Sequence, residues 1–432
     1  MALSSTIRRT LLCSSVDRLG QAALNFIVSI LLARLLTPTD FGLMGGVMFF
    51  AAISYVLVDS GLGKALARTR NADNTHFTTI FFANILISFL LYAAAFITAP
   101  YIARYMDMPE LTMIIRVLFI SLILNAFYIV PHTRLQMSFR FDRIACVNLG
   151  ANVFSAVVAM VAAFNHAGVW ALVAQQMSYH AARMAGFLAA GPLFTITRPS
   201  LQLLYSTMRF SSHITLAALL NAVFSNIYLF IVAKFFHISQ AGQYTHSHRQ
   251  ADNANFTMLA IFEATTYNLL AEQQHHEGHF TVTMRHLMKS VNMVAMPVMM
   301  LVIIIAEPAC RLLFGEQWLP SVPYFQLICL ANITAVVSLL CTNALNVKGM
   351  SRITFWLEVL RKSAIALSAA LTLQYGIEAL LAGYVIASML GTVAQMIAVH
   401  HKTAYSITSQ IADLLPAIGI TAVTAILWRI LL

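Results

Sequence analysis

The residues best placed for chemistry in this 432-residue chain are polar and charged side chains that lie inside or beside long apolar segments. They are Asp17, Arg18, Asp59, Lys64, Arg209, His213 and Glu263. A charge within hydrocarbon is costly, so such residues face a polar interior or pair with one another. Together they predict a mixed, net-basic cavity between two halves of a membrane protein, open to the cytoplasm.

A simpler interpretation exists for the basic members of this set. Arg18, Lys64 and Arg209 lie near predicted span ends, where long basic side chains extend to the membrane surface and only fix orientation. The carboxylates Asp59 and Glu263 fit that interpretation less well, because acidic residues contribute little to orientation and have short stems. Both interpretations stay open at this point.

No motif indicates an enzyme active site. The sequence has no Gly-rich nucleotide loop, no HExxH and no GxSxG. The closest histidine group, His275, His276 and His279, falls in a polar, Gly-containing loop and lacks the fixed ligand geometry of a metal site. We therefore expect no catalytic residues, no metal and no cofactor.

The elements that must position the charges are membrane-spanning helices. Hydrophobic residues make up 59% of the chain and charged residues 10%. Segments of about 20 apolar residues can cross a hydrocarbon core about 30 Å thick. Thirteen such spans are expected, at about 14–36, 42–64, 77–99, 111–131, 144–164, 168–190, 210–235, 251–271, 286–306, 321–346, 353–374, 377–399 and 411–431.

The basic residues predict the orientation of these spans. With a cytoplasmic N-terminus, 19 of the 26 Lys and Arg residues fall on the cytoplasmic side, 6 fall on the other side, and Arg116 lies within a span. This asymmetry follows the positive-inside rule and predicts a multi-pass membrane protein with a cytoplasmic N-terminus. It also accounts for the net charge of +10 without a nucleic-acid partner, since no basic run is interleaved with aromatics.

An internal repeat relates the two halves of the chain. Residues 33–42 read ARLLTPTDFG and residues 233–242 read AKFFHISQAG, so that Gly42 and Gly242 correspond. An even number of spans separates the two segments, which predicts parallel repeats about an axis along the membrane normal. The expected fold is all-α, with two six-helix bundles related by a pseudo-two-fold axis and a C-terminal helix. The predicted domains are an N-terminal lobe at 1–200, a C-terminal lobe at 201–402 and an additional helix at 403–432.

Four segments, spread over nearly the whole chain, form a pattern that is specific when taken together. They are LLARLLTPTDFGLMG (31–45), LVDSGLGKAL (57–66), LLFGEQWLPSVPYFQLIC (312–329) and LNVKGMSRITFWLEVLRK (345–362). With these segments the chain resembles the polysaccharide flippases of the multidrug/oligosaccharidyl-lipid/polysaccharide (MOP) exporter superfamily, in particular the WzxC-like lipopolysaccharide biosynthesis branch. Arg34, Asp40, Phe41 and Gly42 match the outer-turn motif of that family, and Asp59, Gly61 and Gly63 match its second-helix motif.

The resemblance implies export of a polyprenyl-pyrophosphate-linked oligosaccharide by alternating access, for surface polysaccharide biosynthesis. Arg18, Lys64 and Arg209 would then attract the pyrophosphate. Asp17, Asp59 and Glu263 would weaken that attraction or bind a coupling cation. Membrane lipid is the other expected partner. The chain departs from many relatives at Tyr228, where they carry an acid, so that acid's role in ion coupling does not transfer.

Two other functions remain as alternatives. A drug/cation antiporter of the same superfamily would favour carboxylates without nearby bases, whereas bases accompany them here. A membrane glycosyltransferase or polymerase of the same pathway would need a large loop with paired carboxylates or a His/Arg-rich catalytic segment, and the loops are too short for one.

Overall fold

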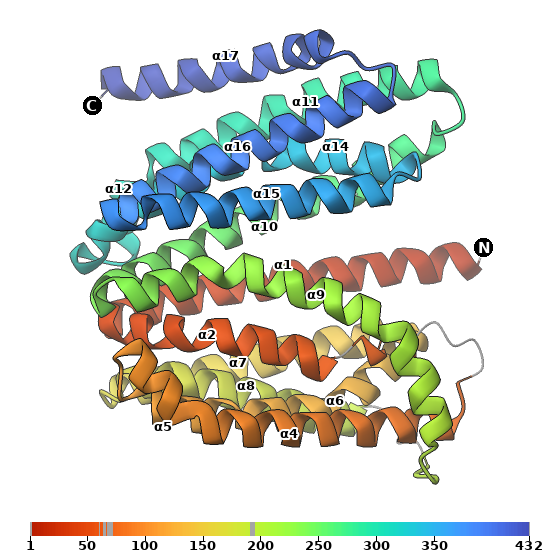
Figure 1. Ribbon diagram of the computed structural model, residues 1–432, viewed down its shortest axis with the longest axis vertical. Helices are drawn as coiled ribbons and strands as arrows, with labels where there is room; N and C mark the ends of the chain where they lie inside the picture. The colour runs from red at the N-terminus through yellow and green to blue at the C-terminus, as the bar shows by residue number, and fades with distance from the viewer. Residues whose placement is uncertain (1, 60, 64–65, 67–71, 191–194, 432) are drawn as a thin grey trace. The chain divides into compact units, whose positions relative to one another are not determined.

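The computed structural model describes residues 2–59, 61–63, 66, 72–190 and 195–431, and these residues form helices joined by short connections (Figure 1). By contact density the chain divides into two compact units, unit 1 at Met1–Gly242 and unit 2 at Gln243–Leu432. In the described part of the chain, nine helices are long and apolar enough to cross a membrane. The predicted all-α, multi-span fold class is therefore confirmed.

The helices of unit 1 match the first seven predicted spans. The pair α5 and α6 forms one span that is interrupted at Phe119. The helices are α1 (Ala2–Leu35), α2 (Pro38–Asp59), α4 (Asn74–Met106), α5 (Leu111–Leu118), α6 (Ile120–Met137), α7 (Phe141–Phe164), α8 (Val169–Ala190) and α9 (Leu201–Phe235).

Unit 1 is built by helices that run alongside one another (Figure 1). Helix α7 packs against α1 and α8, helix α4 packs against α5 and α6, and α2 packs against α9. Large apolar side chains such as Leu86 and Leu90 of α4 are more than half exposed, as expected for a surface that contacts lipid. Helix α9 bends sharply along its length (Figure 1), and its apolar spanning part is Thr215–Phe235.

Unit 2 contains the remaining helices. The polar eighth predicted span corresponds to α10 (Ile238–Glu272), which begins in unit 1. Helix α11 packs against α17, and α16 packs against α13, α14 and α15. The other elements are α11 (Glu277–Ile304), α12 (Ala306–Leu313), the 3-10 helix η1 (Glu316–Ser321), α13 (Val322–Ile333), α14 (Ala335–Val347), α15 (Ser351–Thr372), η2 (Leu373–Tyr375), α16 (Ile377–Lys402) and α17 (Ile407–Leu431).

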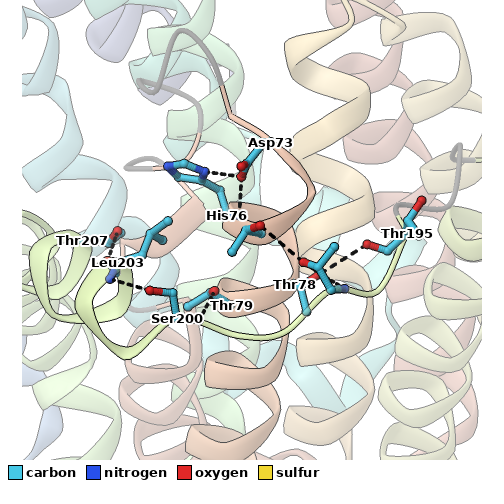
Figure 2. Close-up of polar contacts among 10 residues, drawn as sticks. Asp73, His76, Thr78, Thr79, Thr195, Ser200, Leu203 and Thr207 are labelled. Carbon is cyan, nitrogen blue, oxygen red and sulfur yellow. Dashed lines mark hydrogen bonds and ion pairs between the residues drawn. The ribbon is translucent and has the colours of Figure 1, made fainter.

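The segment that leads into α9 is fixed to the first turns of α4 by threonine side chains (Figure 2). Thr78 Oγ1 accepts from the backbone N–H of Thr197 at 3.2 Å, and Thr79 Oγ1 accepts from that of Ser200 at 3.0 Å. The Ser200 hydroxyl then caps α9 by accepting from the N–H of Leu203. The start of α9 is therefore held by side chains of unit 1 itself.

The last helix, α17, is joined to α11 by a polar clamp. Arg285 donates to both carboxylate oxygens of Asp413, at 2.9 and 3.2 Å, and the Tyr405 hydroxyl donates to the same carboxylate at 2.9 Å. This two-pronged contact holds the last helix of the chain against α11 within unit 2. The predicted count of thirteen spans stays a prediction, since nine helices of the described residues qualify as spans.

Candidate functional site

The two turns of the predicted repeat lie side by side in unit 1 and touch through their glycines. A Cβ atom built on Gly42 would lie 2.1 Å from the carbonyl oxygen of Ile238, and one on Gly242 would lie 1.6 Å from that of Pro38. Pro38 and Ile238 are themselves equivalent in the repeat, so the contact is reciprocal. A reciprocal contact is what a two-fold relation between the two segments produces.

The motif residues around these turns have structural roles. Asp40 accepts hydrogen bonds from the backbone N–H and the hydroxyl of Thr37, at 2.9 and 2.8 Å, which closes the turn between α1 and α2. Gly61, just after α2, has a φ of +62° and packs against Ser211 and Thr215 of α9. Glycine is favoured there because an L side chain would be strained in the left-handed region.

The structure places some of the predicted site residues and leaves others undescribed. Lys64 and the side chains of Arg18 and His213 lie outside the described part of the chain, so their proposed roles stay predictions. Asp17 is half-buried and accepts from the side-chain amides of Gln21, at 2.7 Å, and Asn148, at 3.1 Å. This carboxylate thus joins α1 to α7.

The remaining predicted residues are accessible. Arg209 on α9 and Asp59 at the end of α2 are both exposed in unit 1. Glu263 is exposed on α10 in unit 2, where its backbone carbonyl accepts from Asn343 at 3.4 Å. Their grouping into one cavity stays a prediction.

A hydrogen-bonded relay that the sequence did not reveal lies inside unit 1, between α2, α6 and α8. Arg183 donates to the Tyr128 hydroxyl at 3.0 Å. Both imidazole nitrogens of His180 are engaged, Nδ1 with Tyr128 at 3.1 Å and Nε2 with Tyr55 at 3.0 Å. Tyr55 in turn bonds the Ser121 hydroxyl at 2.6 Å, and Ser121 donates to the carbonyl of Leu118.

The two ends of this relay fix its direction. Arginine can only donate, so the Tyr128 oxygen accepts from Arg183 and its own proton goes to Nδ1 of His180. Neutral His180 then donates from Nε2 to Tyr55, which donates to Ser121. A protonated His180 would leave the Tyr128 hydroxyl without an acceptor in this chain of bonds. The arrangement therefore favours a neutral imidazole and holds a Tyr128 lone pair towards the guanidinium.

The guanidinium of Arg183 is surrounded by aromatic rings. Its Cζ lies 4.5 Å from the ring centroid of Tyr128, 5.3 Å from that of Tyr179 and 5.4 Å from that of Phe187. Its Nε is buried and has no hydrogen-bond partner among the described residues. Rings provide partial compensation for a cation but satisfy none of its N–H donors. The side chain as a whole is half-buried, so part of it remains accessible.

Asp59 lies at the end of α2, close to α6. A Cβ atom built on Gly63 would lie 3.8 Å from Asp59 Oδ1 and 3.2 Å from Thr133 Oγ1 of α6. Arg183 is one of the 19 Lys and Arg residues that the sequence analysis places on the cytoplasmic side. Its position inside the span predicted at 168–190, about two turns before the end of α8, was the signal that could have identified it.

Unit 2 has a separate polar cluster on α15 and α16. Glu358 accepts from Arg361 at 2.8 Å and from the amide of Gln395 at 3.1 Å. Here a carboxylate compensates the guanidinium, in contrast to Arg183. The two units therefore differ in how they accommodate an arginine on a helix that the sequence predicts to span the membrane.

The FGEQW segment of unit 2 has a packing role. Trp318 is fully buried, and its ring centroid lies 4.2 Å from that of His246 on α10. Gln243 and Ser247, also on α10, donate to the carbonyls of Gln317, at 2.8 Å, and Ser321, at 2.7 Å. The segment thus fixes the connection before α13 to the first turns of α10.

Sequence comparisons relate the chain to polysaccharide biosynthesis proteins. The sequence profile of the family described as "Polysaccharide biosynthesis protein" matches residues 31–323. The succinoglycan biosynthesis transport protein ExoT of Rhizobium meliloti (strain 1021) is 23% identical over 366 residues, 84% of this chain and 73% of that protein. The lipopolysaccharide biosynthesis protein WzxC of Escherichia coli (strain K12) is 21% identical over 339 residues, 76% of this chain and 68% of that protein.

Solved structures show the same fold. The lipid II flippase MurJ, in its inward closed conformation, aligns with a TM-score of 0.74 and 12% identity, over 98% of this chain and 99% of MurJ. An inward-facing multidrug resistance transporter of the MATE family, in the MOP superfamily, aligns with a TM-score of 0.71 and 15% identity, over 91% of this chain and 98% of the transporter. At these identities the likeness concerns the fold.

Proposed function

The chain belongs to the polysaccharide biosynthesis protein family, and we propose that it is a flippase that moves a polyprenyl-pyrophosphate-linked oligosaccharide across the bacterial inner membrane. The observation that carries the proposal is the match to ExoT, a protein named for transport in succinoglycan biosynthesis, over 84% of this chain. The flippase activity of MurJ, whose fold is shared over 98% of the chain, supports the same substrate class.

The chemistry of such a substrate requires a polar interior. A headgroup of sugars and pyrophosphate cannot cross hydrocarbon unaided, because its polar groups would lose their hydrogen bonds to water. In the proposed cycle the headgroup enters a cavity while the polyprenyl tail stays in lipid, and movement of the two lobes exposes the cavity to either side. Arg18, Lys64, Arg209 and His213 would contact the headgroup, and Asp17, Asp59 and Glu263 would limit how tightly it is held or bind a coupling cation.

The remaining parts of the proposal follow from the same reasoning. The N-terminus faces the cytoplasm, as the 19-to-6 distribution of basic residues predicts. The protein transports its substrate and does not change a bond in it, in keeping with relatives named for transport. Partners are the lipid-linked oligosaccharide and membrane lipid, with no nucleic acid.

A deletion strain tests the function. We expect a lipid-linked oligosaccharide to accumulate in the cell membrane and the surface polysaccharide to be lost, with both effects reversed by the wild-type gene. Unchanged polysaccharide, with no accumulated intermediate, would contradict the proposal.

The second candidate is a drug/cation antiporter, which the fold of the MATE transporter favours. It predicts instead that the deletion strain becomes sensitive to cationic drugs while its surface polysaccharide is unchanged. The same strain therefore separates the two functions.

A further inference from the structure

We propose that Arg183 is a pyrophosphate-binding residue within unit 1, and that the relay from Tyr128 to Ser121 positions its guanidinium. This inference rests on the proposed function for its substrate, and it adds a binding residue to those predicted from the sequence. Tyr128 and His180 act through Arg183 and are positioning residues.

The first argument concerns charge compensation. A guanidinium inside a membrane span is normally paired with a carboxylate or extends to the membrane surface. Arg361 in unit 2 follows the first pattern, with Glu358 at 2.8 Å. Arg183 instead bonds a neutral hydroxyl and lies against aromatic rings, and no carboxylate of the described residues is within ion-pair distance of it. It is thus left with a charge that an anionic ligand can compensate.

The second argument concerns donors. A guanidinium has five N–H donors, and in the described structure only one bond, to Tyr128, engages them. Nε has no partner there. Pyrophosphate offers several oxygens in the geometry that a guanidinium binds through paired hydrogen bonds. The half-buried position leaves part of the side chain accessible to such a group.

The third argument concerns position. Side chains from three helices form the bonds that orient the Tyr128 hydroxyl oxygen towards Arg183. They are Tyr55, Tyr128 and His180. The Tyr55 and His180 rings also stack, with centroids 5.2 Å apart. Polar networks are costly to bury unless their members are satisfied. Every hydroxyl and both imidazole nitrogens of this relay have a partner, and the Nε of Arg183 is the buried polar atom beside them that has none among the described residues. A residue that only marked orientation would not need this support.

The test uses the full-length protein purified in detergent and titrated with inorganic pyrophosphate, with affinity measured by calorimetry. We expect saturable binding by the wild type. Arg183→Ala should weaken it about ten- to a hundredfold, the size expected for losing a hydrogen bond to a charged group. Arg183→Lys should restore part of the affinity, because lysine keeps the charge and loses the paired geometry. Tyr128→Phe should cause a smaller loss than Arg183→Ala.

Arg143→Ala is the matched control. Arg143, on α7, is another of the 19 basic residues predicted to be on the cytoplasmic side, but it donates to the carbonyl of Ala190 at 2.6 Å and is exposed. We expect its pyrophosphate affinity to equal that of the wild type. The melting temperature and monodispersity of each variant establish whether it is folded. If Arg183→Ala does not fold, the affinity of Arg183→Lys decides the test.

The outcomes separate this inference from the proposed function. Wild-type affinity in a folded Arg183→Ala variant, or no saturable binding by the wild type, would overturn the inference. An Arg183-dependent response to glucuronate in place of pyrophosphate would also overturn it, since it would assign the residue to an acidic sugar. None of these results depends on the deletion strain, whose phenotype tests the flippase function independently.

Discussion

Replacing Gly242 with alanine should force apart the two turns that meet in unit 1. The new Cβ would lie 1.6 Å from the Pro38 carbonyl oxygen and 3.0 Å from the Gly42 nitrogen, whereas real Cβ contacts are essentially never below 3.0 Å. Both neighbours are backbone atoms, so no side-chain rotation can relieve the overlap. The turns must separate by more than about 1 Å, a displacement of the kind that overpacked cores show.

The size of the effect follows from two opposing contributions. Overpacking costs about 1–3 kcal/mol, and an overlap with backbone belongs at the upper end of that range. Alanine in place of glycine stabilises a helix by at most about 1 kcal/mol, because its helix propensity is higher. The contact should therefore be weakened by about 2 kcal/mol, which changes the equilibrium constant between touching and separated turns about thirtyfold.

A thiol cross-link reports this equilibrium. Lys234 and Asp107 form an ion pair at 2.8 Å beside these turns, so cysteines at both positions, in a background without the five native cysteines, should be joined by a bifunctional thiol reagent whose spacer replaces the length of the lysine side chain. We expect Gly242→Ala to slow the cross-linking by up to about thirtyfold, the change in that equilibrium constant. In Gly46→Ala the new Cβ would meet its nearest atoms, on Ala233 and Met106, at an ordinary 3.7 Å, so the rate should not change. Equal rates for Gly242→Ala and the wild type, at equal abundance, would refute the steric argument.

Three further predictions concern stability and orientation. Asp413→Ala should lower the melting temperature, because it removes the carboxylate that accepts from both Arg285 and Tyr405, and exchanging Arg285 and Asp413 should recover part of the loss. Ser200→Ala should lower the unfolding free energy by about 1 kcal/mol through loss of the α9 cap, measured by denaturant titration, whereas no change would exclude the cap. Tyr105→Cys should react with an impermeant thiol reagent in whole cells, and His279→Cys should not. Both positions are exposed, and the prediction places them on opposite sides of the membrane. The reverse labelling pattern would contradict the predicted orientation.

The fold could be predicted because the membrane restricts what a chain can do. Backbone groups in hydrocarbon must be satisfied internally, so apolar segments of sufficient length become helices whatever their detailed packing. The repeat was also readable, since Gly42 and Gly242 stand 200 residues apart in matching segments. The sequence did not show that these glycines touch, because a helix–turn–helix pattern does not indicate which other segment of the chain packs against its turn.

The functional site was less predictable, because the charge of a residue does not indicate which side chains surround it in the fold. Asp17 was expected to line a cavity, and in the structure it accepts from the amides of Gln21 and Asn148 and joins two helices. Arg183 was assigned to orientation, whereas its surroundings come from Tyr128, Tyr179 and Phe187 on two helices. Helical neighbours such as Tyr179 can be read from spacing, but Tyr128 is brought in only by tertiary packing.

The two units show how a duplicated fold can acquire different chemistry in each half. In unit 2, Arg361 is neutralised by Glu358 within its own helix, so that cluster has little electrostatic attraction left for an anion. In unit 1, Arg183 is oriented by an uncharged relay and keeps its positive charge available. A transporter that must bind an anionic headgroup and then release it benefits from such an asymmetry, because a single unneutralised guanidinium attracts the headgroup without the strength of several converging cations. If Arg183 does bind pyrophosphate, introducing a carboxylate beside it, as in Tyr179→Glu, should reproduce the neutralised pattern of unit 2 and weaken binding while leaving the relay through Tyr128 in place.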